Sequence, residues 1–156
     1  MNELEKKIKV ITTNRKAFHE YYISDRFEAG LSLVGTEVKS LRDGKVQMSD
    51  AYVVIENGEA FLVNLHINQY KMSHLDNHEP ARKRRLLLNK REIGKLRRAS
   101  LEKGYTIVPL KIYFKGPYAK VEIGMARGKR QYDKRESIAK RESDRDIARK
   151  MRDRNR

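Results

Sequence analysis

The sequence contains no cysteine and few apolar residues, and both shortages narrow the class of protein it can encode. Without cysteine the chain cannot form a disulfide framework, a zinc knuckle or an iron–sulfur site, and it has no thiol nucleophile. Hydrophobic residues make up 38% of the 156 positions, below the roughly 45–50% of typical globular chains. This content suffices for one modest core and excludes a large catalytic domain.

Several sequence signals of other protein classes are also missing. No apolar run approaches the ~18 residues of a membrane span, and the start MNELEKKIKV is too charged for a signal peptide. The phosphate-binding patterns GxxxxGKS/T and GxGxxG do not occur, nor does the nucleophile motif GxSxG. We therefore expect a soluble, cytoplasmic, non-enzymatic protein with no catalytic residue, cofactor, membrane or small-molecule substrate.

Histidines provide one candidate metal site. His74 and His78, with Asp76 between them, have ligand-type side chains, but no third histidine lies near. A helix would be needed to bring the pair together. A polar loop is the preferred interpretation, and no metal is expected.

Positive charge dominates the composition. The chain has 36 Lys and Arg against 21 Asp and Glu, a formal net charge of +15, and a sequence pI near 10.1. A balanced charge run is usually just a solvated surface, whereas an excess of this size indicates a polyanionic partner, with nucleic acid first. Tyrosines offer stacking faces for unpaired bases or, alternatively, form the wall of a barrel: Tyr21, Tyr22, Tyr105, Tyr113, Tyr118 and Tyr132.

Short β-type segments fill most of the chain up to residue 127. Asn57-Gly58 between two β-branched and aromatic runs predicts a hairpin. Residues 19–23 are expected to form an early strand. Residues 106–114 alternate, which places Val108, Leu110, Ile112 and Phe114 on one side, and Pro109 predicts an edge or a bulge there. Residues 121–125 predict the next strand, and residues 71–85 a mobile basic loop.

Two helices are expected among these strands. Asn89 and Glu92 form a capping-box pattern before Ile93 and Leu96, and residues 36–42 predict a shorter helix or, alternatively, a bent strand. Many strands with few helices favour a mainly β fold, a small oligonucleotide-binding-like barrel, over a parallel sheet. We divide the chain into a flexible N-terminal segment at 1–9, an RNA-binding barrel at 10–127 and a basic tail at 128–156.

The tail differs from the barrel in composition. Its 29 residues include twelve Lys or Arg and six Asp or Glu, a net charge of +6, with few large apolar side chains. Favourable i,i+4 pairs contribute only ~0.2–0.5 kcal/mol each, less than the ~1–2 kcal/mol needed to order each residue. We expect the tail to be disordered when free and helical against an anionic partner.

Six collinear blocks carry a resemblance to a known family. They are NRKAFHEY from Asn14, FEAGLSL from Phe27, GTEVKSLR from Gly35, LLLN from Leu86, GYTIVPL from Gly104 and GKRQYDKR from Gly128. Together they resemble the SsrA-binding protein (small protein B) family, the bacterial partner of transfer-messenger RNA (tmRNA). The match extends from about residue 10 to the end.

The resemblance implies a specific task and a set of site residues. In that family the barrel binds the tRNA-like domain of tmRNA and delivers it to stalled ribosomes for trans-translation. The tail enters the decoding site and the empty message channel, where it becomes helical. Expected RNA contacts are Asn14, Arg15, Lys16, His19, Glu28, Lys39, Arg42, Lys45 and Lys120. Gly128, Lys129, Arg130, Tyr132, Lys134 and Arg135 are expected at the decoding site of the small ribosomal subunit.

Three points stay open from the sequence. Glu28 either accepts hydrogen bonds from RNA, orients a neighbouring cation or forms an ordinary surface ion pair. Tyr132 stands where some family members have His, and Lys150 where some have an apolar residue. The alternatives to the adaptor function are a ribosomal-protein-like barrel and a small RNA-processing enzyme.

Overall fold

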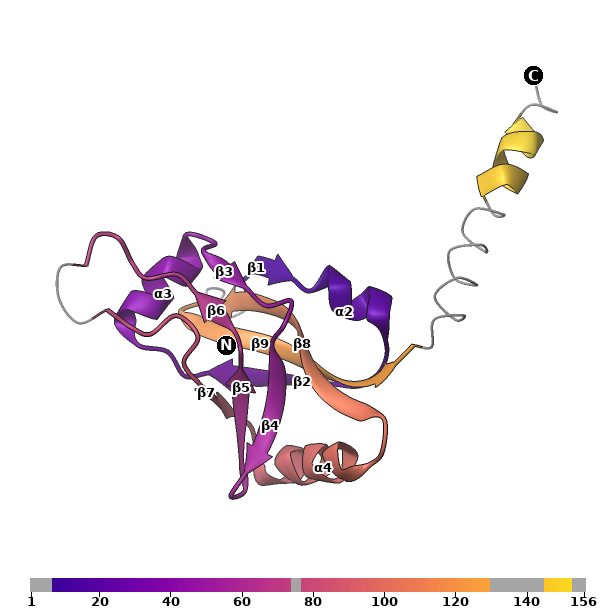
Figure 1. Ribbon diagram of the computed structural model, residues 1–156. Coiled ribbons are helices and arrows are strands. Elements are labelled where there is room, and N and C mark those ends of the chain that lie inside the picture. Colours follow the sequence, from indigo (N-terminus) through magenta and orange to yellow (C-terminus); the bar gives the residue numbers. More distant parts are fainter. Residues whose placement is uncertain (1–6, 74–76, 130–144, 153–156) are drawn as a thin grey trace.

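A computed structural model describes residues 7–73, 77–129 and 145–152. Nine strands and three helices are named in this part of the chain (Figure 1), in the order β1 (Ile8–Thr13), α2 (Arg15–Glu20), β2 (Tyr21–Leu31), α3 (Gly35–Arg42), β3 (Val46–Gln47), β4 (Tyr52–Glu56), β5 (Glu59–Val63), β6 (His66–Ile67), β7 (Arg84–Leu87), α4 (Lys90–Leu101), β8 (Tyr105–Lys115) and β9 (Tyr118–Gly128). Residues 145–152 form a further helical segment.

Seven strands form one antiparallel sheet in the order β1-β8-β9-β2-β7-β5-β4, and β3 pairs with β6. Strand β4 also contacts β8, so the sheet curls back toward itself. Among the described residues β1 and β4 remain its unpaired edges. The expected class, mainly β with a few helices and a partly open barrel, is confirmed.

The two faces of β8 carry different clusters of buried residues. Ile107 and Leu96 of α4 belong to the main core inside the curl. Val108 packs with Ala17 of α2 in a second cluster on the other side. Neighbouring residues of a strand point to opposite faces, so α2 and α4 cover opposite faces of β8. We call the face toward the main core the inner face and the other the outer face.

A β-bulge in β8 changes which residues point outward. The register with β9 shifts between Pro109 and Lys111, as the proline predicted, although β8 lies inside the sheet and not at its edge. Before the bulge Val108 faces outward, whereas beyond it Ile112 and Phe114 lie in the main core. The expected single row from Val108 to Phe114 is therefore wrong, because the extra residue reverses the alternation.

Several sequence expectations are confirmed. Asn57 and Gly58, with φ of 50° and 74°, connect β4 to β5. Asn89 caps α4 by accepting a hydrogen bond from the backbone N–H of Glu92 at 2.9 Å, and the Glu92 side chain completes the capping box.

Other expectations are corrected. His19 belongs to α2 and not to a strand, because Asn14 caps this short helix and Ala17 anchors it on the outer face. The first strand begins at Ile8, two residues before the expected barrel boundary. Residue 84, expected in a mobile loop, opens β7.

Arg84 is fully buried, together with Glu37 of α3. Its Nε donates to Oε2 of Glu37 at 2.5 Å, and its other nitrogens donate to the carbonyls of Leu65, Arg82 and Pro80. Arg82 approaches the same carboxylate at 2.5 Å. Because a buried charge is tolerated only when paired and hydrogen-bonded, this cluster ties α3, β7 and the 65–82 connection together. Arg84 is therefore a core residue and not part of a mobile basic loop.

Candidate nucleic-acid interface

Charged side chains line the outer face between α2 and the turn that joins β8 to β9. The register pairs Glu28 with Glu122, and on the other side of β9 it pairs Tyr113 with Lys120 and Lys111 with Glu122. Side chains that are directly opposite or diagonal on one face of a sheet lie within reach of one another. We call this surface the outer-face strip and define it by Arg26, Glu28, Lys111, Tyr113, Lys115, Lys120 and Glu122.

Glu28 organises the strip near the β8–β9 turn. Its Oε2 accepts a hydrogen bond from the Tyr113 hydroxyl, and its Oε1 lies 3.5 Å from Nζ of Lys115. The Tyr113 hydrogen bond, together with the charges of Lys115 and Lys120, lowers the pKa of Glu28 and outweighs its partial burial. The carboxylate is thus held ionised at neutral pH and orients cations.

Glu122 extends this arrangement toward α2. Its carboxylate lies 3.2 Å from Arg26 and 4.0 Å from Lys111. The Arg26 guanidinium lies over the ring of Phe18 in α2, 5.4 Å from its centroid. The strip therefore continues from the turn to α2 along one face. Arg26 was missed from the sequence, because only the register shows that it faces Glu122.

The turn end of the strip opens into two hollows. One, of about 230 Å³, is lined by Lys120, Tyr118 and the exposed Leu87 among others, and the next, of about 430 Å³, by Lys7, Lys9 and Arg42. Phe114 and Pro117 line both hollows. The Arg42 guanidinium lies 4.5 Å from the centroid of the Phe114 ring. Arg42 and Lys120 thus line neighbouring hollows beside this turn, whereas Glu28 lies on the outer face and lines neither.

The α2 residues lie at the other end of the strip. Arg15 and His19 are exposed, and Lys16 pairs with Asp50 at 3.4 Å. The bulge that anchors α2 is six residues from the turn along β8, about 20 Å at ~3.3 Å per residue.

Asn14, an expected RNA contact, makes its hydrogen bonds within the fold. It is buried, with 4% of its surface exposed. Its Oδ1 accepts from the backbone N–H of Ala17, and its Nδ2 donates to the Pro109 carbonyl at 2.9 Å. Its backbone N–H donates to the Leu110 carbonyl. With its amide used in this way, Asn14 positions α2 on the bulge.

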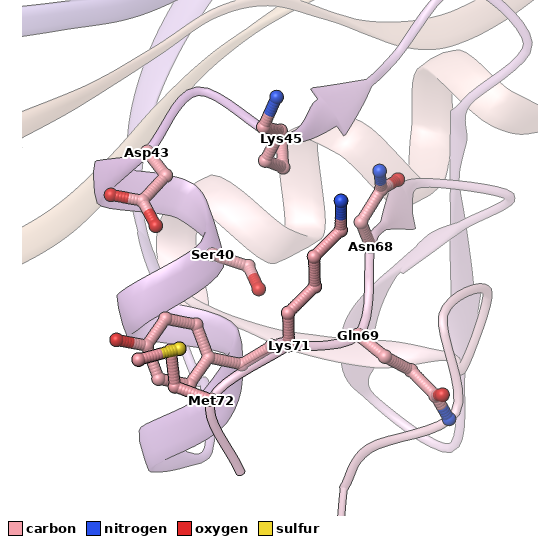
Figure 2. Close-up of a pocket in the computed structure, with 8 residues that line it drawn as sticks. Ser40, Asp43, Lys45, Asn68, Gln69, Lys71 and Met72 are labelled. Carbon is pink, nitrogen blue, oxygen red and sulfur yellow. The ribbon is translucent and has the colours of Figure 1, made fainter.

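Two further cations, Lys45 and Lys71, line a separate hollow beside α3 (Figure 2). This cavity of about 300 Å³ lies between the end of α3 and residues 68–72, and Lys45, Lys71, Asn68 and Asp43 are among its lining residues. Lys39 lies over the Tyr70 ring, 5.5 Å from its centroid. The predicted RNA-binding residues thus form three groups, at α2, at the β8–β9 turn and around this hollow.

Tyrosines divide between the two expected roles. Tyr113 is buried and belongs to the barrel wall, where burial and the Glu28 carboxylate raise its pKa. Tyr22 and Tyr118 are exposed by 49% and 64%. Lys129 lies over the Tyr22 ring, 5.2 Å from its centroid. Tyr118 therefore offers an exposed ring at the turn end of the strip, whereas Tyr22, between Tyr21 and Ile23 of the outer cluster, faces the other side of the sheet.

The junction with the tail is held by backbone pairing. Gly128 pairs with Tyr21 at the end of β9, and the N–H of Lys129 donates to the Glu20 carbonyl at 2.8 Å. The chain therefore leaves the sheet beside the last turn of α2. The predicted decoding-site residues Arg130, Tyr132, Lys134 and Arg135 lie outside the described residues.

Two further features concern sites of other kinds. His78 is buried, and its ring nitrogens contact the Thr36 hydroxyl and the Ile67 carbonyl, both at 2.8 Å. Residues 74 and 76 lie outside the described part, and no cluster suited to a metal ion occurs within it. A search of the described helices for one long and apolar enough to cross a bilayer finds none.

The fold and the strip define a class: a small, basic, RNA-binding barrel protein. Comparison with known sequences supplies the family. The family model described as SmpB protein matches residues 11–153. The chain is 53% identical over 148 residues to the SsrA-binding protein of Geotalea uraniireducens, covering 95% of this chain and 98% of that one. It is 54% identical over 144 residues to the SsrA-binding protein of Carboxydothermus hydrogenoformans, covering 92% and 97%. The chain belongs to the SmpB family.

A solved structure agrees with this assignment. The chain resembles one described as "tmRNA-SmpB: a journey to the center of the bacterial ribosome" with a TM-score of 0.66 and 48% sequence identity. The similarity covers 83% of this chain and 94% of that one.

Proposed function

We propose that this protein is a non-enzymatic adaptor that binds the tRNA-like domain of tmRNA and delivers it to stalled ribosomes for trans-translation. The observation that carries the proposal is family membership over nearly the whole chain. The structural neighbour adds tmRNA and the ribosome as the setting of a close relative. Because the ribosome is the partner, we assign the protein to the cytoplasm.

The outer-face strip and the cations at its two ends supply a physical basis for gripping RNA. Lys111, Lys115 and Lys120 project from strands of the sheet, so the fold sets their backbone positions before RNA binds. Glu28 pairs with Lys115, and Glu122 pairs with Lys111 and Arg26. We assign the grip to the exposed expected residues of α2, to Arg42 and Lys120 near the turn, and to Lys39 and Lys45 near the separate hollow at the end of α3.

The tail has a separate proposed task. Its net charge of +6 suits a channel walled by ribosomal RNA phosphates, because cations gain affinity by releasing counterions from phosphates. A message in the channel would exclude the tail sterically. We propose that the tail senses whether the channel is empty, with Lys129, Arg130, Tyr132, Lys134 and Arg135 at the decoding site.

A titration of the isolated tRNA-like domain at several salt concentrations tests the RNA-binding role. Lys120→Gln should weaken binding and reduce the slope of log K against log[salt] by about 0.7–0.9, the contribution of one phosphate contact. Lys95→Gln, which removes an equal charge from α4, is the matched control and should leave both unchanged. Equal effects of the two variants would remove the outer-face strip from the account.

Truncation tests the division of labour. A chain ending at Lys129 retains every described strand and should bind the tRNA-like domain as tightly as the full chain. Tagging of stalled polypeptides in a reconstituted translation reaction should be lost. Retained tagging would disprove the proposed role of the tail.

A further inference from the structure

The outward face of α4 carries a dense group of cations that the proposed function does not use. Lys90, Arg91, Lys95, Arg97 and Arg98 are all exposed, whereas Leu96 and Ala99 are buried against the barrel. At 100° per residue the five cations fall within an arc of about 160°, and they extend about 12 Å along the helix axis. We call this surface the α4 basic face.

None of the cations of this face has an acidic partner among the residues that the structure describes. Within the described residues no carboxylate lies at ion-pair distance from any of the five; Arg98 makes one hydrogen bond, at 3.5 Å, to the carbonyl of Gly94. Just beside the helix, on β7, Arg85 pairs with Glu59 at 3.1 Å. The α4 basic face is therefore an uncompensated positive surface.

Helix stability accounts for Arg98, which lies in the last turn where the dipole favours a cation, but not for the cations of the first turn. Lys90 and Arg91 lie in the first turn, where the helix dipole favours negative side chains. Arg91 and Lys95 are four residues apart, a spacing at which like charges repel. The helix thus carries an electrostatic cost that a negatively charged partner would relieve.

The α4 basic face is also separate from the outer-face strip. Leu96 packs into the main core on the inner face, whereas the strip lies on the outer face of the same strands. Figure 1 shows α4 and α2 at different ends of the molecule. An RNA held on the strip therefore leaves the α4 basic face free for a second partner.

The chemistry of the α4 basic face specifies the kind of partner. Helix α4 contains no aromatic residue, so it cannot stack on unpaired bases in the way single-strand binders do. Its cations suit the phosphates of an RNA duplex, which proteins contact largely by shape and backbone. We propose that the α4 basic face binds a double-helical segment of ribosomal RNA while the outer-face strip holds tmRNA. This rests on the proposed function, because the second RNA matters only when the first is in place.

Directed hydroxyl-radical cleavage tests the proposal. Because the sequence contains no cysteine, a probe attached to an introduced cysteine labels one position only. Ser100→Cys places a single thiol on α4 and Pro117→Cys one at the β8–β9 turn, each in the full-length chain. An iron chelate attached to that thiol cuts nearby RNA when hydroxyl radicals are generated. The complex is assembled with tmRNA and ribosomes halted on a message without a stop codon.

We expect the α4 probe to cut ribosomal RNA in a helical segment and the turn probe to cut tmRNA. No ribosomal RNA cleavage from α4, or cleavage of tmRNA alone, would overturn the α4 proposal. Failure of the turn probe to cut tmRNA would instead count against the outer-face strip, so the two claims fail separately.

Charge removal gives a second readout. Lys95→Gln combined with Arg98→Gln should reduce the salt slope for binding of the tmRNA-loaded protein to these ribosomes by about 1.4–1.8, two phosphate contacts. The affinity of this double variant for the isolated tRNA-like domain should not change. An unchanged slope on ribosomes would contradict the proposal.

Discussion

Glu37→Gln is predicted to destabilise the barrel strongly, although it changes one atom of the side chain. The variant removes the negative charge that faces Arg84, whose side chain is 0% exposed, as is that of Glu37. Breaking a buried ion pair by removing one partner costs ~3–5 kcal/mol, because the remaining charge is buried without compensation. Domains of this size have total stabilities of ~5–15 kcal/mol, so the loss is a large share.

Urea unfolding followed by circular dichroism measures this loss. Glu56→Gln is the matched control, since Glu56 pairs with Lys83 on the surface and is half exposed. An exposed pair contributes ~0–1 kcal/mol, so the control should differ little from the parent protein. A combined Glu37→Gln and Arg84→Met variant should regain much of the loss, because it no longer buries a lone charge.

The pH dependence of stability provides an internal check. Burial raises the pKa of Glu37, but hydrogen bonds from Arg82 and the Val34 N–H, with the Arg84 charge, lower it below its ordinary value of 4.5. A lowered folded-state pKa stabilises the protein above the unfolded-state pKa, and this contribution is lost as the pH falls through the folded-state pKa. Glu37→Gln should lack that part of the acid sensitivity. A loss below 1 kcal/mol, with unchanged acid sensitivity, would refute this account of the cluster.

Two further predictions concern the sheet. Gly124→Ala would place a Cβ 2.8 Å from Cγ2 of Ile23 and 2.9 Å from Cδ1 of Leu110. We expect this overpacking to lower the free energy of unfolding by ~1–3 kcal/mol. Gly128→Ala is the control: its new Cβ would have no atom within 4 Å, so the free energy of unfolding should change by no more than ~0.5 kcal/mol. Equal unfolding midpoints would show that the outer cluster is loosely packed. Tyr113→Phe should raise the pKa of Glu28 toward its ordinary value, since the Tyr113 hydroxyl is the largest cause of its lowering; an NMR titration of the Glu28 carboxyl that finds no rise would contradict that cause.

Local sequence signals predicted the turns and helix ends that depend only on residues close in the sequence. Asn57-Gly58 adopts positive φ without a partner elsewhere in the chain, and Asn89 caps α4 through a residue three positions away. The mainly β class followed from the number of such short segments.

The features that were missed depend on distant residues. Arg84 lies in a run of basic residues and resembles a surface cation, but its burial is set by Glu37, 47 positions away. The bulge at Pro109 reverses the alternation of β8. The Asn14 side chain, 95 positions away in the sequence, donates a hydrogen bond to the Pro109 carbonyl. Composition indicated a nucleic-acid partner, whereas the placement of Arg26 and Glu122 on one strip required the register of β2 and β9.

The central claim is that one face of the barrel, formed by β2, β8 and β9, receives the tRNA-like domain. Mapping backbone amide shifts of the labelled protein during addition of that RNA tests it most directly. We expect the largest changes at Arg26, Lys111 and Lys120, with additional changes in α2 and little change on α4. Shifts concentrated on α4 or on β4 and β5, with the outer-face strip unaffected, would contradict the account.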